Sequence, residues 1–137
     1  MLKWRGGPTG MCVLCQNCIE SRNHLFFECD FSSTVWAALA HGLLKSRYTT
    51  DWQLLIDIIS TNQFTKVEAF LTRYVIQAVV YAIWRERNGR RHGESAQTAE
   101  RITAWVDKQI RNRISAIRLM GDKRYEKAYQ FWIQTRD

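Results

Sequence analysis

The sequence has a single proline and only seven glycines, too few for a loop-rich or collagen-like chain. Its most apolar run, residues 74–84, is interrupted by Gln77 and followed by charged residues, so no stretch approaches the ~20 apolar residues of a membrane span. The first residues also lack the apolar segment of a secretory signal. These absences predict a soluble, intracellular chain, nuclear or cytoplasmic, with no membrane partner.

Cysteine is confined to one short part of the chain. All four cysteines lie within residues 12–29. In a reducing compartment such a cluster binds metal more often than it forms disulfides. The remaining composition, 46% hydrophobic with six tryptophans, is that of one globular domain in 137 residues.

The formal net charge is +7, with 20 Lys and Arg against 13 Asp and Glu. A basic balance of this size favours an anionic partner, and nucleic acid is the usual candidate. An ordinary basic protein, or a fragment cut from a larger chain whose remainder is acidic, would have the same balance.

Hydrophobic periodicity predicts a mainly α fold, in which a bundle of four to five helices follows an N-terminal knuckle formed by the cysteine-rich segment. We expect residues 1–11 to form a loop, 12–45 to form the knuckle plus a first helix, and 46–137 to form a helical region packed as one domain with the knuckle. The first expected helix begins near Thr34, after a Ser32 or Ser33 cap, and ends near Lys45, and the second runs from Thr50 or Asp51 to Asn62. The third spans 66–87, between a Thr65 cap and an Asn88-Gly89 stop, and the fourth spans 97–119. Residues 123–135 are expected to form a short helix or an extended segment.

The two long predicted helices differ in character. Residues 66–87 are apolar over most of the helix circumference, which predicts the buried central element. Residues 97–119 carry a narrow apolar stripe, and four basic residues lie together on another side: Arg101, Lys108, Arg111 and Arg118. We expect these four to contact the phosphates of RNA or DNA.

The cysteine cluster has the spacing Cys12-x2-Cys15-x8-His24-x4-Cys29. Two short arms that each supply two ligands suit one structural zinc ion in a closed tetrahedral site, with no position left open for a reactive water. Cys18 is a competing ligand, because Cys15-x2-Cys18 is also a valid arm. Buried, reduced cysteines without metal are the plain alternative.

The flanks of the cluster carry a family resemblance. Cys12-Val-Leu-Cys15, then residues 23–29 with the sequence NHLFFEC, then Phe31 and Val35-Trp36, resemble the reverse-transcriptase zinc-binding domain found near the C-terminus of plant LINE-type (non-LTR) retrotransposon polyproteins. Segments 2–4, 83–88 (IWRERN), 110–115 and the closing aromatics Tyr125 and Phe131-Trp132 look like further parts of that region. In most relatives the position of Cys18 is polar or acidic, so the resemblance implies Cys12, Cys15, His24 and Cys29 as the ligands.

The polymerase itself is absent. The chain has no YxDD motif, no Ser/His/Asp set and no HExxH, and Gly6–Gly10 lacks the lysine of a P-loop. We therefore expect no enzyme and no small-molecule substrate. The expected function is a non-catalytic module that associates with RNA or DNA through the finger and the basic helices, with Phe27 left open as a base-stacking residue. The alternative is a structural or protein-interaction domain that braces a neighbouring reverse transcriptase or another protein. Charge runs such as Arg85-Glu86-Arg87 are expected to be solvated.

Overall fold

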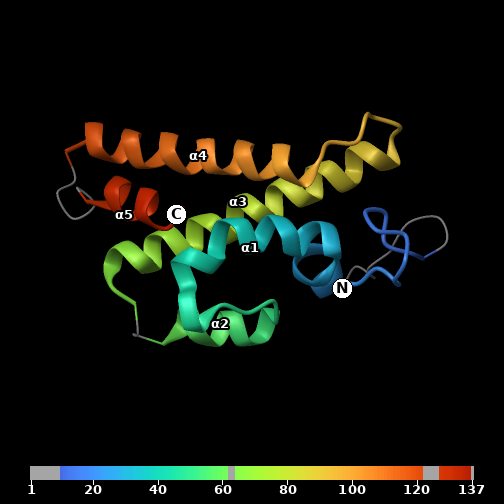
Figure 1. Cartoon of the computed structure of the whole chain (residues 1–137), viewed down its shortest axis with the longest axis horizontal. Coiled ribbons are helices and arrows are strands. Elements are labelled where there is room, and N and C mark those ends of the chain that lie inside the picture. The colour runs from blue at the N-terminus through green and yellow to red at the C-terminus, as the bar shows by residue number, and fades with distance from the viewer. Residues whose placement is uncertain (1–9, 62–63, 122–126, 137) are drawn as a thin grey trace.

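The computed structural model describes residues 10–61, 64–121 and 127–136, and the regular elements among these residues are all helices (Figure 1). This confirms the predicted mainly α fold. The elements, in chain order, are η1, a turn of π-helix (His24–Glu28), α1 (Asp30–Leu44), η2, a 3₁₀ turn (Lys45–Arg47), α2 (Trp52–Ser60), α3 (Lys66–Arg91), α4 (Ala99–Leu119) and α5 (Ala128–Gln134).

Helix α3 is the central element, as predicted: it contacts η1, α1, α2, α4 and α5. Its start is fixed by a capping box, in which the Thr65 hydroxyl accepts from the Glu68 N–H and the Glu68 carboxylate accepts from the Thr65 N–H. The predicted stop at Asn88-Gly89 is wrong, because the helix continues to Arg91 and is capped at His92. A helical glycine costs only about 1 kcal/mol relative to alanine, which tertiary contacts of the last turn readily offset.

The circumference of α3 is less buried than its composition suggests. Tyr81 is 58% exposed and Trp84 is 40% exposed. By length and composition α3 is also the one helix of the described residues that could cross a membrane. Here the neighbouring helices pack on it, which is the arrangement of a core helix in a soluble domain.

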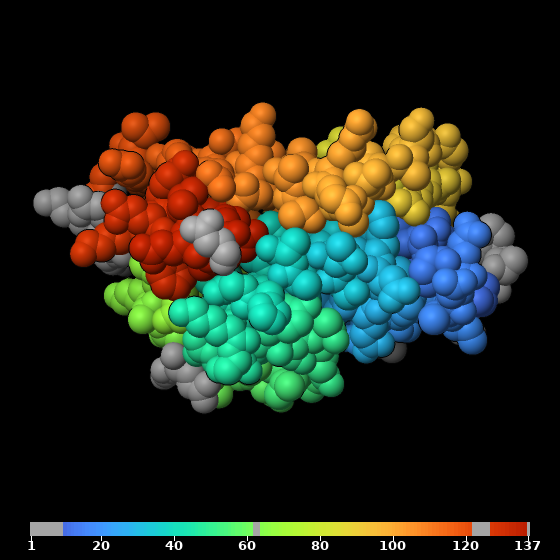
Figure 2. Space-filling view, in the orientation of Figure 1, coloured from blue at the N-terminus to red at the C-terminus, as the bar shows by residue number. Residues whose placement is uncertain are grey.

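Helices α3 and α4 form a hairpin, and α1 packs against both (Figure 1). The predicted apolar stripe of α4 is confirmed, since its members all face the core: Ile102, Val106, Ile110, Ile114 and Ile117. The zinc-knuckle segment lies at one end of the molecule beside α1, and α5 lies at the other end against α4 (Figure 2).

Helix α1 begins at Asp30, four residues before the predicted start at Thr34. Cys29 occupies the N-cap position, so the predicted cap Ser32 lies inside the helix, where its buried hydroxyl donates to the carbonyl of Leu25. The metal-ligand segment thus runs directly into the first long helix, with no separate capping residue between them.

The predicted start of α2 is confirmed. Asp51 caps α2 as expected, with its carboxylate accepting from the Leu54 N–H. The predicted stop at Asn62 and the aromatic Tyr125 lie outside the described residues. Within the described part of the tail, Ala128–Gln134 form helix α5, whose Trp132 is fully buried and donates from its indole N–H to Asp107 of α4 at 2.7 Å.

Candidate metal centre

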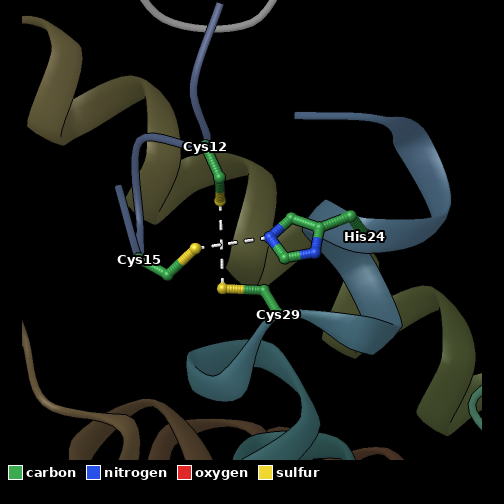
Figure 3. A group of neighbouring side chains, drawn as sticks. All are labelled: Cys12, Cys15, His24 and Cys29. Atoms are coloured by element: carbon green, nitrogen blue, oxygen red, sulfur yellow. Dashed lines mark hydrogen bonds between the residues drawn. The ribbon is translucent and has the colours of Figure 1, made fainter. Parts of the chain in front are cut away.

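The first ligand arm is a tight turn. The N–H of Gln16 donates to the carbonyl of Cys12 at 2.8 Å, and Gln16 takes a left-handed φ of 57°. The N–H of Cys12 donates to the carbonyl of Cys18, and an antiparallel bridge pairs Met11 with Ile19. The knuckle is therefore closed by backbone hydrogen bonds, and the Cys12 and Cys15 side chains lie on one side of it (Figure 3).

The second arm is the π-helical turn. His24 begins η1 and Cys29 follows its last residue, with the Cys29 N–H donating to the His24 carbonyl at 2.7 Å. A five-residue separation suits a π-turn, in which residues i and i+5 are joined by the backbone hydrogen bond. The turn thus brings His24 and Cys29 to the same side, facing the first arm (Figure 3).

The four side chains converge on one point. The sulfurs of Cys12 and Cys29 are 3.8 Å apart, Sγ of Cys15 lies 3.4 Å from Nε2 of His24, and all four ligand atoms lie within 4.8 Å of one another (Figure 3). Tetrahedral zinc with bonds of ~2.3 Å to sulfur and ~2.0 Å to nitrogen would place two sulfurs about 3.8 Å apart and a sulfur and a nitrogen about 3.5 Å apart. The cluster is compatible with one zinc ion.

Burial is uneven across the cluster. Cys12 and Cys29 are buried, Cys15 and His24 are half-buried, and Cys18 is exposed and outside the group. This geometry favours Cys12, Cys15, His24 and Cys29 as the ligand set over any set that includes Cys18. This donor set, three thiolates and an imidazole, is typical of structural zinc.

The thiols differ in acidity when no metal is bound. Burial raises the pKa of Cys29 to about 12 and raises that of Cys12 as well. Burial also acts to raise the pKa of Cys15, but hydrogen bonds from the backbone N–H of Asn17 and from His24 outweigh it and lower the value to about 6. The metal-free cluster thus offers one ready thiolate, and a bound metal would deprotonate the other two thiols.

The knuckle is fastened to α3 by a buried ion pair. Arg87 donates from Nη2 to Glu20 at 2.8 Å and from Nε to both carboxylate oxygens at 3.0 and 3.1 Å. Both side chains are at most 2% exposed. The predicted solvated run Arg85-Glu86-Arg87 is therefore wrong for its last two members, because Glu86 and Arg87 lie four residues beyond the core residues Ala82 and Ile83 on the inward face of α3.

Arg90 makes a second connection one turn further along α3. Its guanidinium pairs with Glu86 at 2.6 Å, donates to the carbonyl of Leu14 inside the Cys12–Cys15 turn, and lies 4.7 Å from the ring centre of Phe31. Sequence reasoning missed these roles of Glu20, Arg87 and Arg90. For Arg87 the available signal was the IWRERN segment at residues 83–88, which accompanies the finger in the family that the sequence resembles.

Phe27 does not present its ring to solvent. It is 2% exposed, stacked on Trp52 at 5.3 Å and edge-on to Trp36 at 5.4 Å between ring centres. The prediction of Phe27 as a base-stacking residue is therefore wrong, because both sides of the ring are occupied by the core. Leu25 and Trp36 are fully buried and Phe31 is partly buried, as expected for residues that pack the finger on α1.

The four basic residues expected on α4 differ in their exposure and in their partners. Arg101, Lys108 and Arg118 are exposed, whereas Arg111 is half-buried and pairs with Asp107 at 2.9 Å. The paired guanidinium of Arg111 already has a carboxylate partner, so three of the four remain open to an external anion.

Comparison with known proteins agrees with this geometry. Residues 1–36 match the family model described as zinc-binding in reverse transcriptase. No curated protein and no solved structure gives a significant match. The matched stretch contains all four residues of the cluster and ends in the first turns of α1. The N-terminal segment of this chain is therefore similar to the zinc-binding domain of reverse transcriptases.

Proposed function

We propose that the chain is a non-catalytic, zinc-organised module of reverse-transcriptase machinery that associates with RNA or DNA. The observation that supports it best is the closed Cys₃His cluster. Because protein side chains fill all four positions of a tetrahedral ion, no coordination site is left for the water that zinc hydrolases activate. A metal held in this way organises the fold.

The nucleic-acid part of the proposal is supported by charge. The chain carries a net +7, and Arg101, Lys108 and Arg118 of α4 are exposed. Lys and Arg that neutralise phosphates release counterions, which gives affinity without sequence specificity. An origin in a plant LINE-type element, and a nuclear or cytoplasmic site of action, belong to the same proposal and are supported by the sequence resemblance alone.

Fluorescence anisotropy with labelled single-stranded RNA, single-stranded DNA and duplex DNA tests this function on the zinc-loaded chain. We expect binding whose logarithmic affinity falls linearly with the logarithm of salt between about 50 and 200 mM. No binding at the low end, or affinity that is independent of salt, would contradict the electrostatic model.

The second candidate is a protein-interaction module that braces a polymerase or another chain. It is favoured by Leu119 and Met120 at the end of α4, which are 88% and 80% exposed. Adjacent exposed apolar side chains are more typical of a contact surface than of a solvated helix end. Sedimentation of the isolated chain distinguishes the two candidates. The protein-interaction module requires self-association or partner binding, whereas the first candidate requires nucleic acid.

A further inference from the structure

One face of α3 is left open by the other helices. Lys66, Phe70, Arg73 and Tyr74 share this face at helical spacing, and together with Arg113 of α4 they line an open hollow of about 680 Å³. None of the side chains that line it is acidic. The hollow lies away from the zinc-binding cluster, and of its α3 residues Phe70 and Tyr74 belong to the apolar circumference from which burial was expected.

A second hollow of about 300 Å³ continues the first along the α3–α4 hairpin. The two share Tyr74 and Gln77, and the second adds Tyr81 of α3 and Trp105 of α4. At 1.5 Å per residue, the α3 part from Lys66 to Tyr81 spans about 22 Å. We call this combined feature the α3–α4 groove.

Aromatic rings line the groove in two stacked pairs. Phe70 and Tyr74 lie 6.2 Å apart between ring centres with planes 21° apart, and Tyr81 and Trp105 lie 6.2 Å apart with planes 28° apart. Tyr81 is 58% exposed and the other three are partly buried. Tyr81 is held by Trp105 and still exposes more than half of its surface, unlike Phe27, which the core encloses.

The cations of the groove are not neutralised within the described residues. Lys66, Arg73 and Arg113 are all exposed, and none pairs there with a carboxylate. By contrast, Arg47, Arg87, Arg90 and Arg111 each hold an acidic partner. Three of the cations that remain available to an external anion therefore lie in this groove.

We propose that the α3–α4 groove binds single-stranded nucleic acid, with bases on its aromatic rings and phosphates on Lys66, Arg73 and Arg113. This rests on the proposed function and assigns it a location. Unpaired cations interleaved with aromatic faces along an open groove are the composition that single-strand binding requires. Duplex bases are already stacked on one another and cannot reach the rings, so the groove selects single strands. Contacts to bases by stacking and to phosphates by charge carry no distinction between ribose and deoxyribose.

The test uses the zinc-loaded full chain and a labelled 20-mer of U or dT. Arg73→Gln/Arg113→Gln removes two groove cations, whereas Arg101→Gln/Arg118→Gln makes the same charge change at two exposed α4 cations that the proposed function already names outside the groove. Tyr81→Leu removes one stacking face, and Tyr81→Phe restores it. All four substitutions in the double variants are at exposed positions, so circular dichroism is expected to match that of the parent chain.

We expect the groove double variant to bind at least tenfold more weakly at ~100 mM salt, with its salt slope reduced by about two. Tyr81→Leu should weaken binding about fivefold or more with an unchanged slope, and Tyr81→Phe should recover it. A parent chain that binds neither single strands nor duplex overturns both this proposal and the proposed function, and one that binds duplex alone overturns the groove only. A parent chain that binds, with the loss confined to Arg101→Gln/Arg118→Gln, overturns the groove and leaves the function standing. Equal affinity for duplex and single strand overturns the stacking part. RNA and DNA 20-mers are expected to bind within a fewfold of each other.

Discussion

Arg87 and Glu20, 67 residues apart in the chain, form a buried ion pair that joins α3 to the segment between the two ligand arms. The N–H of Val13, between Cys12 and Cys15, also approaches the Glu20 carboxylate at 3.4 Å. The position of the first ligand arm is therefore tied to the central helix by a charge pair that solvent does not screen.

Removing one partner of this pair should be costly. We expect Arg87→Met to lower the free energy of unfolding by about 3–5 kcal/mol, because the Glu20 carboxylate would stay buried without its partner. The double variant Arg87→Met/Glu20→Leu should lose clearly less than the sum of the two single variants. Urea denaturation of the zinc-loaded protein measures all three, and strict additivity would show that the pair is not coupled.

Metal stoichiometry tests the ligand set. Native mass spectrometry should find one zinc in the parent chain and in Cys18→Ser, since the Cys18 thiol lies outside the cluster. His24→Ala should lose the ion or hold it far more weakly. A chelator should lower the thermal midpoint of the parent chain, because metal binding free energy contributes to folding free energy. Loss of zinc in Cys18→Ser would overturn the proposed ligand set.

Gly42 is expected to accept a side chain only at a cost while Thr135, the C-cap of α5, is in place. A Cβ at this position would lie 2.2 Å from the backbone carbonyl oxygen of Thr135. Gly42→Ala should therefore destabilise the full chain by about 1–3 kcal/mol, since backbone must shift to make room. In a chain ending at Gln134 the clash is absent, and the same substitution should stabilise α1 by up to about 1 kcal/mol. Thermal unfolding of the two pairs measures this reversal of sign, and an equal effect in both backgrounds would contradict it.

Glu68 should contribute a stability term that depends on pH. Burial acts to raise the pKa of its carboxyl, but hydrogen bonds from Thr65 and the ion pair with Arg47 at 3.0 Å outweigh it and lower the pKa below its usual 4.5. A lowered folded-state pKa gives stability that is present above the unfolded-state pKa and lost as pH falls through the folded-state value.

Glu68→Gln separates this charge from the capping box, because a glutamine amide can still accept from the Thr65 N–H. We expect the variant to be less stable than the parent by about 0.5–1 kcal/mol at pH 7, a partly exposed ion pair being worth no more. The difference should shrink between pH 7 and pH 3, as the pH falls toward the lowered pKa of the Glu68 carboxyl. Urea midpoints at the two pH values measure it, and a difference that does not change with pH would exclude the charge as its cause.

The helices and the metal ligands were predictable because their signals are local. The i+3 and i+4 spacing of Ile102, Val106 and Ile110 fixes a helix and its buried face, and a Cys-x2-Cys arm brings two sulfurs together through one turn. The start of α1 was not predictable from capping rules, since Cys29 serves at once as a ligand candidate and as the N-cap.

What only the tertiary structure decided depends on contacts between residues far apart in the chain. Arg87 looks solvated in sequence, and it is buried because Glu20 supplies a carboxylate from the knuckle. Phe27 looks available for stacking, and it is enclosed because Trp36 and Trp52 arrive from two other helices. By itself the sequence determined which side chains could bind zinc and which segments are helical, because short-range spacing governs both. Which charges are neutralised and which aromatic faces remain open was decided by packing, since burial is a property of the neighbours that the folded chain brings together.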